Sequence, residues 1–127
     1  MPFTTLEKLR NGATARVTWG DDPSKNEPDS IDPLPTDGEW SVYLTAKGNP
    51  DFGQYAPIGP ALTVHADTFE GLRALVEEYK ECHFLGGGNF GQPVVKLRGK
   101  KIGNLSWGGR LFESTQSFNV VDVSEYA

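Results

Sequence analysis

The sequence has few of the residues on which several protein classes depend. Among its 127 residues there is one cysteine, Cys82, so no internal disulfide can form, and we expect a reducing compartment, the cytoplasm. No apolar run approaches the roughly 18 residues of a transmembrane helix, and we predict no membrane contact. Residues 1–5 contain neither the basic nor the apolar part of a secretory signal, so none is expected.

Residues suited to nucleophilic catalysis or zinc binding are equally scarce. The two histidines, His65 and His83, together with Cys82 lack the spacing of a zinc site. Cys82 and His83 are neighbours, and neighbouring side chains on a helix point about 100° apart, so they do not face each other. His65 is the histidine that can approach the thiol through the fold. A small enzyme around these three residues is kept as an alternative, and no catalytic residue, cofactor or metal ligand is assigned.

Acidic and basic side chains occupy different parts of the chain. The formal net charge is −5, but residues 20–39 contain seven acids and one base, whereas residues 82–112 contain five bases and no acid. The acidic segment also contains four prolines and lacks the spacing of a calcium-binding loop. We predict that residues 20–39 form a long solvated loop without regular structure.

Hydrophobic periodicity predicts a mixed α+β fold. Thr4 to Glu7 match a helix-capping box and Asn11-Gly12 a helix stop, which predicts a short N-terminal helix over residues 5–10. A strand is predicted wherever apolar and polar residues alternate, which they do over residues 13–19, 40–46 and 61–66.

One long amphipathic helix is predicted over about residues 68–83. A second capping box, Asp67 to Glu70, precedes it, and its apolar residues recur at helical spacing. Arg73 and Glu77 are spaced to pair on its polar face. We expect the glycines at 86–88 to end this helix. Because they follow a helix C-terminus, where the dipole is negative, we do not interpret them as a phosphate-binding loop.

The C-terminal third predicts further strands. Residues 92–98 and 101–107 predict a hairpin joined at Gly99-Lys100, and residues 117–123 predict a last strand. The pattern contains no repeated βαβ unit. It favours one domain, residues 1–127, in which a mostly antiparallel sheet packs against the long helix.

Two charged surfaces are the candidate binding sites. The first is acidic and combines the loop with the helix: Asp21, Asp22, Glu27, Asp29, Asp32, Glu77, Glu78 and Glu81. Closely spaced carboxylates are suited to a basic groove that a partner protein uses for nucleic acid. The second is basic and belongs to the predicted hairpin: Lys96, Arg98, Lys100, Lys101, Arg110 and Trp107. Cations beside exposed rings are typical of proteins that bind single-stranded nucleic acid directly, which is the alternative function.

The C-terminal segment also resembles a known group of proteins. Gly88 to Gly91, the basic hairpin and Leu105 to Phe112 are similar to the closing segment of small uncharacterised proteins of bacteriophages and other mobile elements. The resemblance implies a short accessory protein that acts by binding, a class that includes anti-defence and anti-CRISPR inhibitors. Together with the charge pattern, it leads us to expect a non-enzymatic protein that inhibits a host defence complex through its acidic surface.

Overall fold

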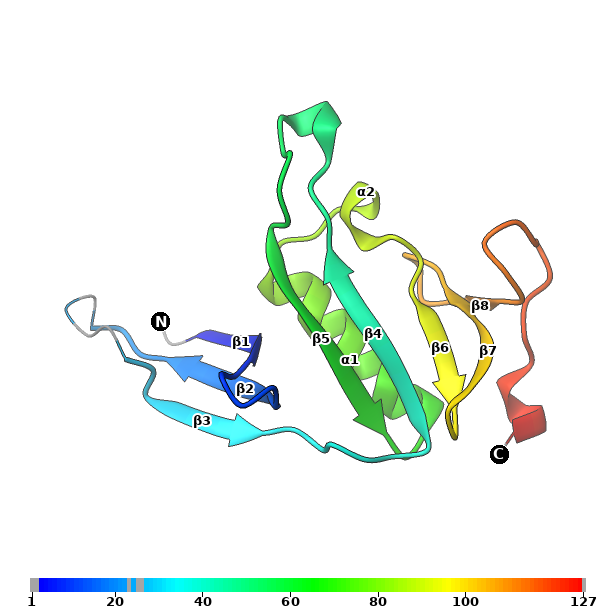
Figure 1. The fold of residues 1–127 in the computed structure, drawn as a ribbon, viewed down its shortest axis with the longest axis horizontal. Helices are drawn as coiled ribbons and strands as arrows, with labels where there is room; N and C mark the ends of the chain where they lie inside the picture. The colour runs from blue at the N-terminus through cyan, green and yellow to red at the C-terminus, as the bar shows by residue number, and fades with distance from the viewer. Residues whose placement is uncertain (1–2, 23, 25–26, 127) are drawn as a thin grey trace.

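A computed structural model describes residues 3–22, 24 and 27–126 and confirms the α+β class, with two antiparallel sheets and one long helix (Figure 1). The first sheet has the order β1 (Phe3–Lys8), β2 (Thr14–Trp19), β3 (Ser30–Pro33). The second has the order β5 (Gly59–Ala66), β4 (Trp40–Ala46), β6 (Val94–Leu97), β7 (Lys100–Leu105), β8 (Leu111–Phe112). The helical segments are α1 (Phe69–Cys82), α2 (Gly87–Phe90) and the 3-10 turns η1 (Pro50–Phe52) and η2 (Val123–Tyr126).

The helix predicted over residues 5–10 is wrong, because residues 5–8 belong to strand β1 and residues 9–10 lead into a turn. β1 pairs with β2 along its whole length, from Phe3 opposite Trp19 to Lys8 opposite Thr14. Asn11-Gly12 is the turn of this hairpin, with Gly12 in the left-handed region (φ 87°) and its N–H donating to Leu9 O at 2.9 Å. A six-residue helix has little stability of its own, so the pairing with β2 decides the conformation.

The acidic segment 20–39 is also more regular than predicted. Its residues 30–33 form β3, which pairs with β2, with Asp32 opposite Arg16 and Pro33 opposite Ala15. Proline is tolerated here because β3 is an edge strand, whose outer N–H groups need no partner in the sheet. All four residues of β3 are exposed, whereas Leu34, which follows them, is buried in the core.

The second sheet packs one face against α1, as the alternation of β4 predicts. Trp40, Val42, Leu44 and Ala46 are buried, whereas Tyr43 and Thr45 are exposed. In Figure 1, α1 lies behind the strands of this sheet, and no helix covers the face toward the viewer. Among the described residues no helix is long and apolar enough to cross a membrane.

The main helix begins one residue later than the second capping box predicts. Thr68 is the N-cap residue, and its hydroxyl accepts a hydrogen bond of 3.0 Å from the N–H of Gly71. The expected pair between Arg73 and Glu77 is not formed; Arg73 instead pairs with Glu70, one turn toward the N-terminus, at 3.2 Å. The order of this pair is favourable because the glutamate lies on the N-terminal side of the arginine, which is the better orientation of an ion pair on a helix.

The C-terminal third departs from its predicted elements in two places. Arg98 and Gly99, with φ of 51° and 82°, are the central residues of the β6–β7 turn, so Lys100 already belongs to β7. The strand predicted over residues 117–123 is wrong. This segment makes one isolated bridge, between Val120 and Phe112, and then enters η2.

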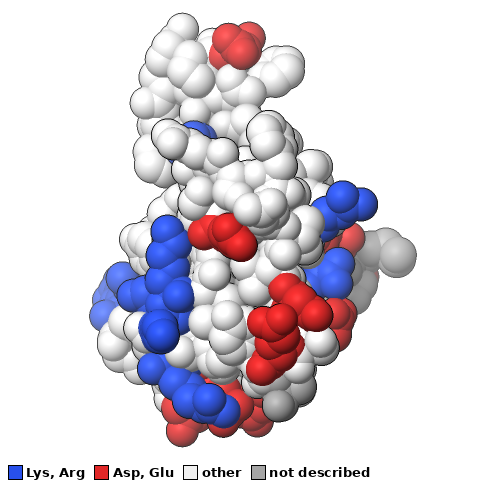
Figure 2. Space-filling model, turned by 90° about the vertical axis from the view of Figure 1, so that its right-hand side faces the viewer, with Lys and Arg blue, Asp and Glu red and all other residues white. Residues whose placement is uncertain are grey.

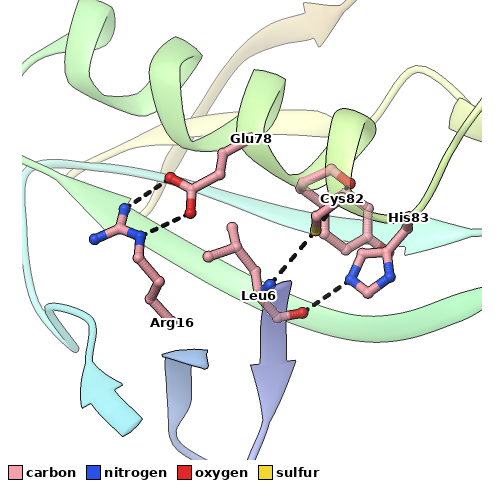
Figure 3. Close-up of polar contacts among 6 residues, drawn as sticks. Leu6, Arg16, Glu78, Cys82 and His83 are labelled. Carbon is pink, nitrogen blue, oxygen red and sulfur yellow. Dashed lines mark hydrogen bonds and ion pairs between the residues drawn. The ribbon is translucent and has the colours of Figure 1, made fainter. Parts of the chain in front are cut away.

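The three-stranded sheet is joined to the rest of the molecule through both α1 and β5. Leu6 of β1 is fully buried in the same core as the α1 residues Leu72 and Val76. Arg16 of β2 makes a bidentate ion pair with Glu78 of α1, with both N–O distances at 2.7 Å (Figure 3). Apolar packing and this ion pair together fix the first sheet beside β5.

Candidate binding surfaces

The C-terminus of α1 ends in a backbone motif that normally requires glycine. The N–H of Leu85 donates to Lys80 O at 3.0 Å, and the N–H of Phe84 donates to Glu81 O at 3.3 Å. These two bonds form a Schellman motif, in which the residue at the position of Phe84 takes the left-handed conformation. Phe84 has φ 55°. The glycines at 86–88 therefore do not end the helix, as the sequence suggested.

Phe84 is unfavourable at this position for two separate reasons. A left-handed backbone costs a residue with a Cβ about 1–2 kcal/mol, which glycine would avoid. Its side chain is also 90% exposed, so the ring gains little from burial. A strained backbone that displays an aromatic ring to solvent is the kind of feature found at binding sites.

Hollows lie on both sides of Phe84. One has a volume of about 630 Å³ and extends from Phe84 and Glu81 to Trp107 and Glu77. The other, of about 430 Å³, lies between Phe84 and Phe3 of β1 and includes Glu81 and Glu78. We define the Phe84 surface by five residues that line these hollows: Phe3, Glu77, Glu81, Phe84 and Trp107. Phe3 and Trp107 are 58% and 41% exposed.

A buried lysine holds one side of the Phe84 surface in place. Lys80 is 6% exposed. Its Nζ donates to Glu77 Oε1 and to Trp107 O, both at 2.6 Å, and lies 4.3 Å from the centre of the Trp107 ring. The ring of Phe90 lies on another side of the ammonium, at 5.4 Å. These contacts satisfy the buried charge and fix the indole beside α1.

The three acids predicted on the helix have different roles. Glu78 is bound to Arg16, and this pairing raises the pKa of the arginine. Glu77 is bound to Lys80. Glu81 is exposed, and no ion pair to a described residue is found for it. Glu81 is therefore the carboxylate of this group that is available to a partner.

The acids of segment 20–39 do not extend the helix acids into one surface. Asp21, Asp22 and Glu27 belong to the β2–β3 connection, which lies at the far end of the first sheet from α1 in Figure 1. Asp22 accepts hydrogen bonds from the N–H and hydroxyl of Ser24, which lower the pKa of its carboxyl. Asp29 follows on the same connection, and its N–H donates to Thr18 O at 2.8 Å.

Asp32 occupies a different position from the other loop acids. It lies opposite Arg16 in the β2–β3 ladder, and its charge contributes to the raised pKa of that guanidinium. Arg16 thus lies between Asp32 and Glu78. Its positive charge offsets their negative charges where the loop and helix acids approach each other. A continuous acidic surface from loop to helix is not present among the described residues.

The predicted basic surface is also divided. Lys96 and Lys101 are directly opposite each other in the β6–β7 ladder, whereas Lys100 is opposite the buried Leu97 and so belongs to the other face. Arg98 does not share a face with Lys96, because it lies in the turn, where it pairs with Glu39 at 3.1 Å. Figure 2 shows basic side chains at the left and lower end of the view and also at its right, with acidic side chains between them and at the lower end.

Trp107 and Arg110 do not belong to the tip of this hairpin. They lie in the connection between β7 and β8, where the N–H of Arg110 donates to Ser106 Oγ at 3.1 Å. Trp107 packs against Phe90, with ring centroids 5.9 Å apart. Trp107 therefore belongs to the Phe84 surface, next to acids rather than next to the lysines of β6 and β7.

The three residues of the enzyme alternative are not assembled into a catalytic pair. Cys82 Sγ accepts from the N–H of Leu6 at 3.5 Å, and burial raises the pKa of its thiol (Figure 3). His83 Nε2 lies 2.9 Å from Leu6 O, to which it donates. His65 is on β5, on the face that α1 does not cover. Among the described residues, no hydrogen bond joins any two of these side chains, and no group of three metal-binding side chains is found.

In comparisons with known proteins, no family model, no curated protein and no solved structure matches this chain. The sequence missed Phe84, Phe3 and Tyr43, which are exposed aromatic residues. A signal for Phe84 was present: an aromatic residue stands before the glycines, at the place where the apolar stripe of the helix ends.

Proposed function

We propose that this chain is a non-enzymatic binding protein that docks a basic segment of a partner protein on the Phe84 surface. The observation that carries the proposal is Phe84 itself, held in a left-handed backbone and 90% exposed. Neither property helps the fold, and glycine would serve the helix end better. In the isolated chain the ring is exposed, and a contact with a partner would bury it.

The Phe84 surface is best matched by a partner segment that carries an arginine with apolar neighbours. The hollow of about 430 Å³ has Phe3 and Phe84 as walls and Glu81 on its rim. A guanidinium can stack on an aromatic face and at the same time make paired hydrogen bonds to a carboxylate. Arginine is preferred over lysine for such a site because its planar group is less strongly hydrated.

This proposal narrows the acidic surface expected from the sequence. The contact is assigned to the Phe84 surface, with Glu81 as its available carboxylate. The β2–β3 connection with Asp21, Asp22 and Glu27 is not part of it. An inhibitor of a host nucleic-acid-binding protein, which the resemblance to mobile-element proteins implies, would use this surface against a basic groove. The resemblance and the inhibitory role stay predictions.

A peptide selection tests the proposal without knowledge of the partner. A random peptide library is selected against the immobilised protein, and the selected peptides are measured against variants by fluorescence anisotropy. We expect arginine flanked by apolar residues to be enriched. We expect Phe84→Gly to weaken binding more than tenfold and Glu81→Gln to weaken it by about two- to fivefold, the range of one exposed cation–π contact or ion pair.

The matched control is Phe118→Gly, because Phe118 is also fully displayed, at 96% exposed, but lies outside the Phe84 surface. It should bind the selected peptides like the wild type. Replacing the peptide arginine by citrulline, which keeps the shape and removes the charge, should reproduce the loss seen with Glu81→Gln. Peptides that lack basic residues, or that bind Phe84→Gly as tightly as the wild type, would contradict the proposal.

A further inference from the structure

The uncovered face of the five-stranded sheet is a second surface, separate from the Phe84 surface. α1 packs on the opposite face, which holds Trp40, Val42 and Leu44 of β4. The uncovered face holds the alternate residues, and in Figure 1 it is turned toward the viewer without a helix in front of it. A sheet face left open in this way is available to a flat, extended ligand.

The strand register places a row of polar side chains across this face. His65 of β5 is opposite Ser41 of β4, Ser41 is opposite Lys96 of β6, and Lys96 is opposite Lys101 of β7. Residues directly opposite in a ladder project from the same face. Four strands at the usual spacing give the row a width of about 14 Å. Lys96 and Lys101 are exposed, and no ion pair to a described residue is found for either.

An exposed tyrosine lies beside this row. Tyr43 is two residues from Ser41 on β4, so it projects from the same face, and it is 57% exposed. Its cross-strand neighbour is Thr63 of β5. The face therefore combines an exposed aromatic ring with hydroxyl groups and two lysines.

The charge of this face differs from that of the whole molecule. The chain contains 17 acids and carries a formal net charge of −5, yet none of the five strands contains an aspartate or a glutamate. The charged residues of this face are the exposed Lys96 and Lys101, so the face carries a positive charge toward solvent. A polyanion is the complementary ligand, because a peptide with basic residues would be repelled by the lysines.

We propose that this open face binds single-stranded nucleic acid, with a base stacked on Tyr43 and backbone phosphates on Lys96 and Lys101. A single strand fits better than a duplex, because its bases are free to stack on an exposed ring. The contact set replaces the one expected from the sequence. Tyr43 takes the stacking role expected of Trp107, and Arg98, Lys100 and Arg110 are not part of it.

The test measures the binding of fluorescein-labelled oligothymidine and oligouridine by anisotropy at several salt concentrations. Two phosphate contacts predict that log K falls with log salt concentration with a slope of about −1.4. Lys96→Gln/Lys101→Gln should bring this slope close to zero. Tyr43→Ala should weaken binding about tenfold at every salt concentration and leave the slope unchanged, because stacking releases no counterions.

The matched control is Lys8→Gln/Arg10→Gln, which removes the same charge from exposed positions of the first hairpin. It should bind like the wild type, and Tyr43→Phe should restore binding that Tyr43→Ala loses. No binding at low salt would overturn the proposal. Equal losses of binding in the two double variants would also overturn it, because they indicate a non-specific response to charge. The same holds for binding that Tyr43→Ala does not weaken and that polyphosphate competes as well as unlabelled oligonucleotide does.

Discussion

Replacing Phe84 by alanine and by glycine separates the backbone from the ring. Both changes remove the exposed side chain, so their difference in stability reports the left-handed backbone together with the conformational entropy that glycine loses on folding. That conformation costs alanine about 1–2 kcal/mol. Glycine loses about 0.5–1 kcal/mol more conformational entropy on folding. Phe84→Gly should therefore be about 0.5–1 kcal/mol more stable than Phe84→Ala.

The ring itself should contribute little to folding. It is 90% exposed. Of a side chain of about 200 Å², this leaves about 20 Å² buried, which corresponds to roughly 0.5 kcal/mol. Phe84→Ala should thus lie within about 0.5 kcal/mol of the wild type, and both variants should lose peptide binding.

Urea unfolding followed by circular dichroism measures these differences, and in thermal unfolding they correspond to a shift of about 2–4 °C between the two melting temperatures. A glycine variant that is no more stable than the alanine variant would refute the left-handed assignment. An alanine variant that loses more than about 2 kcal/mol would instead place the ring in the core.

Three further predictions concern the contacts behind the Phe84 surface. A double-mutant cycle on Arg16→Ala and Glu78→Ala should give a coupling of about 0.5–1 kcal/mol by urea unfolding, because the pair is partly exposed; a coupling near zero would contradict its role in joining the first sheet to α1. Burial raises the pKa of the Cys82 thiol, so the folded state keeps its proton longer than the unfolded state. The contribution of Cys82 to the free energy of unfolding should therefore be constant below pH of about 8.5 and fall above it, and Cys82→Ala should remove the fall that begins there. Tyr79→Phe should cost about 1–2 kcal/mol in the same assay, because the Tyr79 hydroxyl donates to Pro60 O at 2.6 Å and its loss leaves that acceptor unpaired; an unchanged stability would show that water replaces the bond.

The elements that the sequence predicted correctly are those whose periodicity is long and whose burial is one-sided. β4 alternates over seven residues and α1 carries an apolar stripe over 14 residues, so each buries one face whatever its neighbours are. β1 and β3 are short, and their conformation depends on pairing with the neighbouring strand β2. Asn11-Gly12 serves equally as a helix stop or a hairpin turn, and the pairing of β1 with β2 selects the turn.

The candidate surfaces were harder to predict because they depend on register and on positive φ angles. One residue of difference in the β6–β7 turn moves Arg98 off the face of Lys96 and brings it to Glu39. The sequence places Glu78 on an acidic, solvent-exposed surface, but in the structure Arg16, which is 62 positions earlier, pairs with it. Local sequence contains no record of such long-range pairs, so charge clusters along a chain overstate the charge that a surface presents.

The outer edge of β3 has a consequence for how the protein behaves at high concentration. An edge strand can accept a strand from another molecule, which is how sheets grow into fibres. Here Ile31 is 48% exposed on that edge, but Pro33 lacks the N–H that an added strand would bind, and Asp32 adds a charge. These two residues limit strand addition, so the tetrapeptide that gives the acidic segment its regular structure also keeps the sheet from extending between molecules.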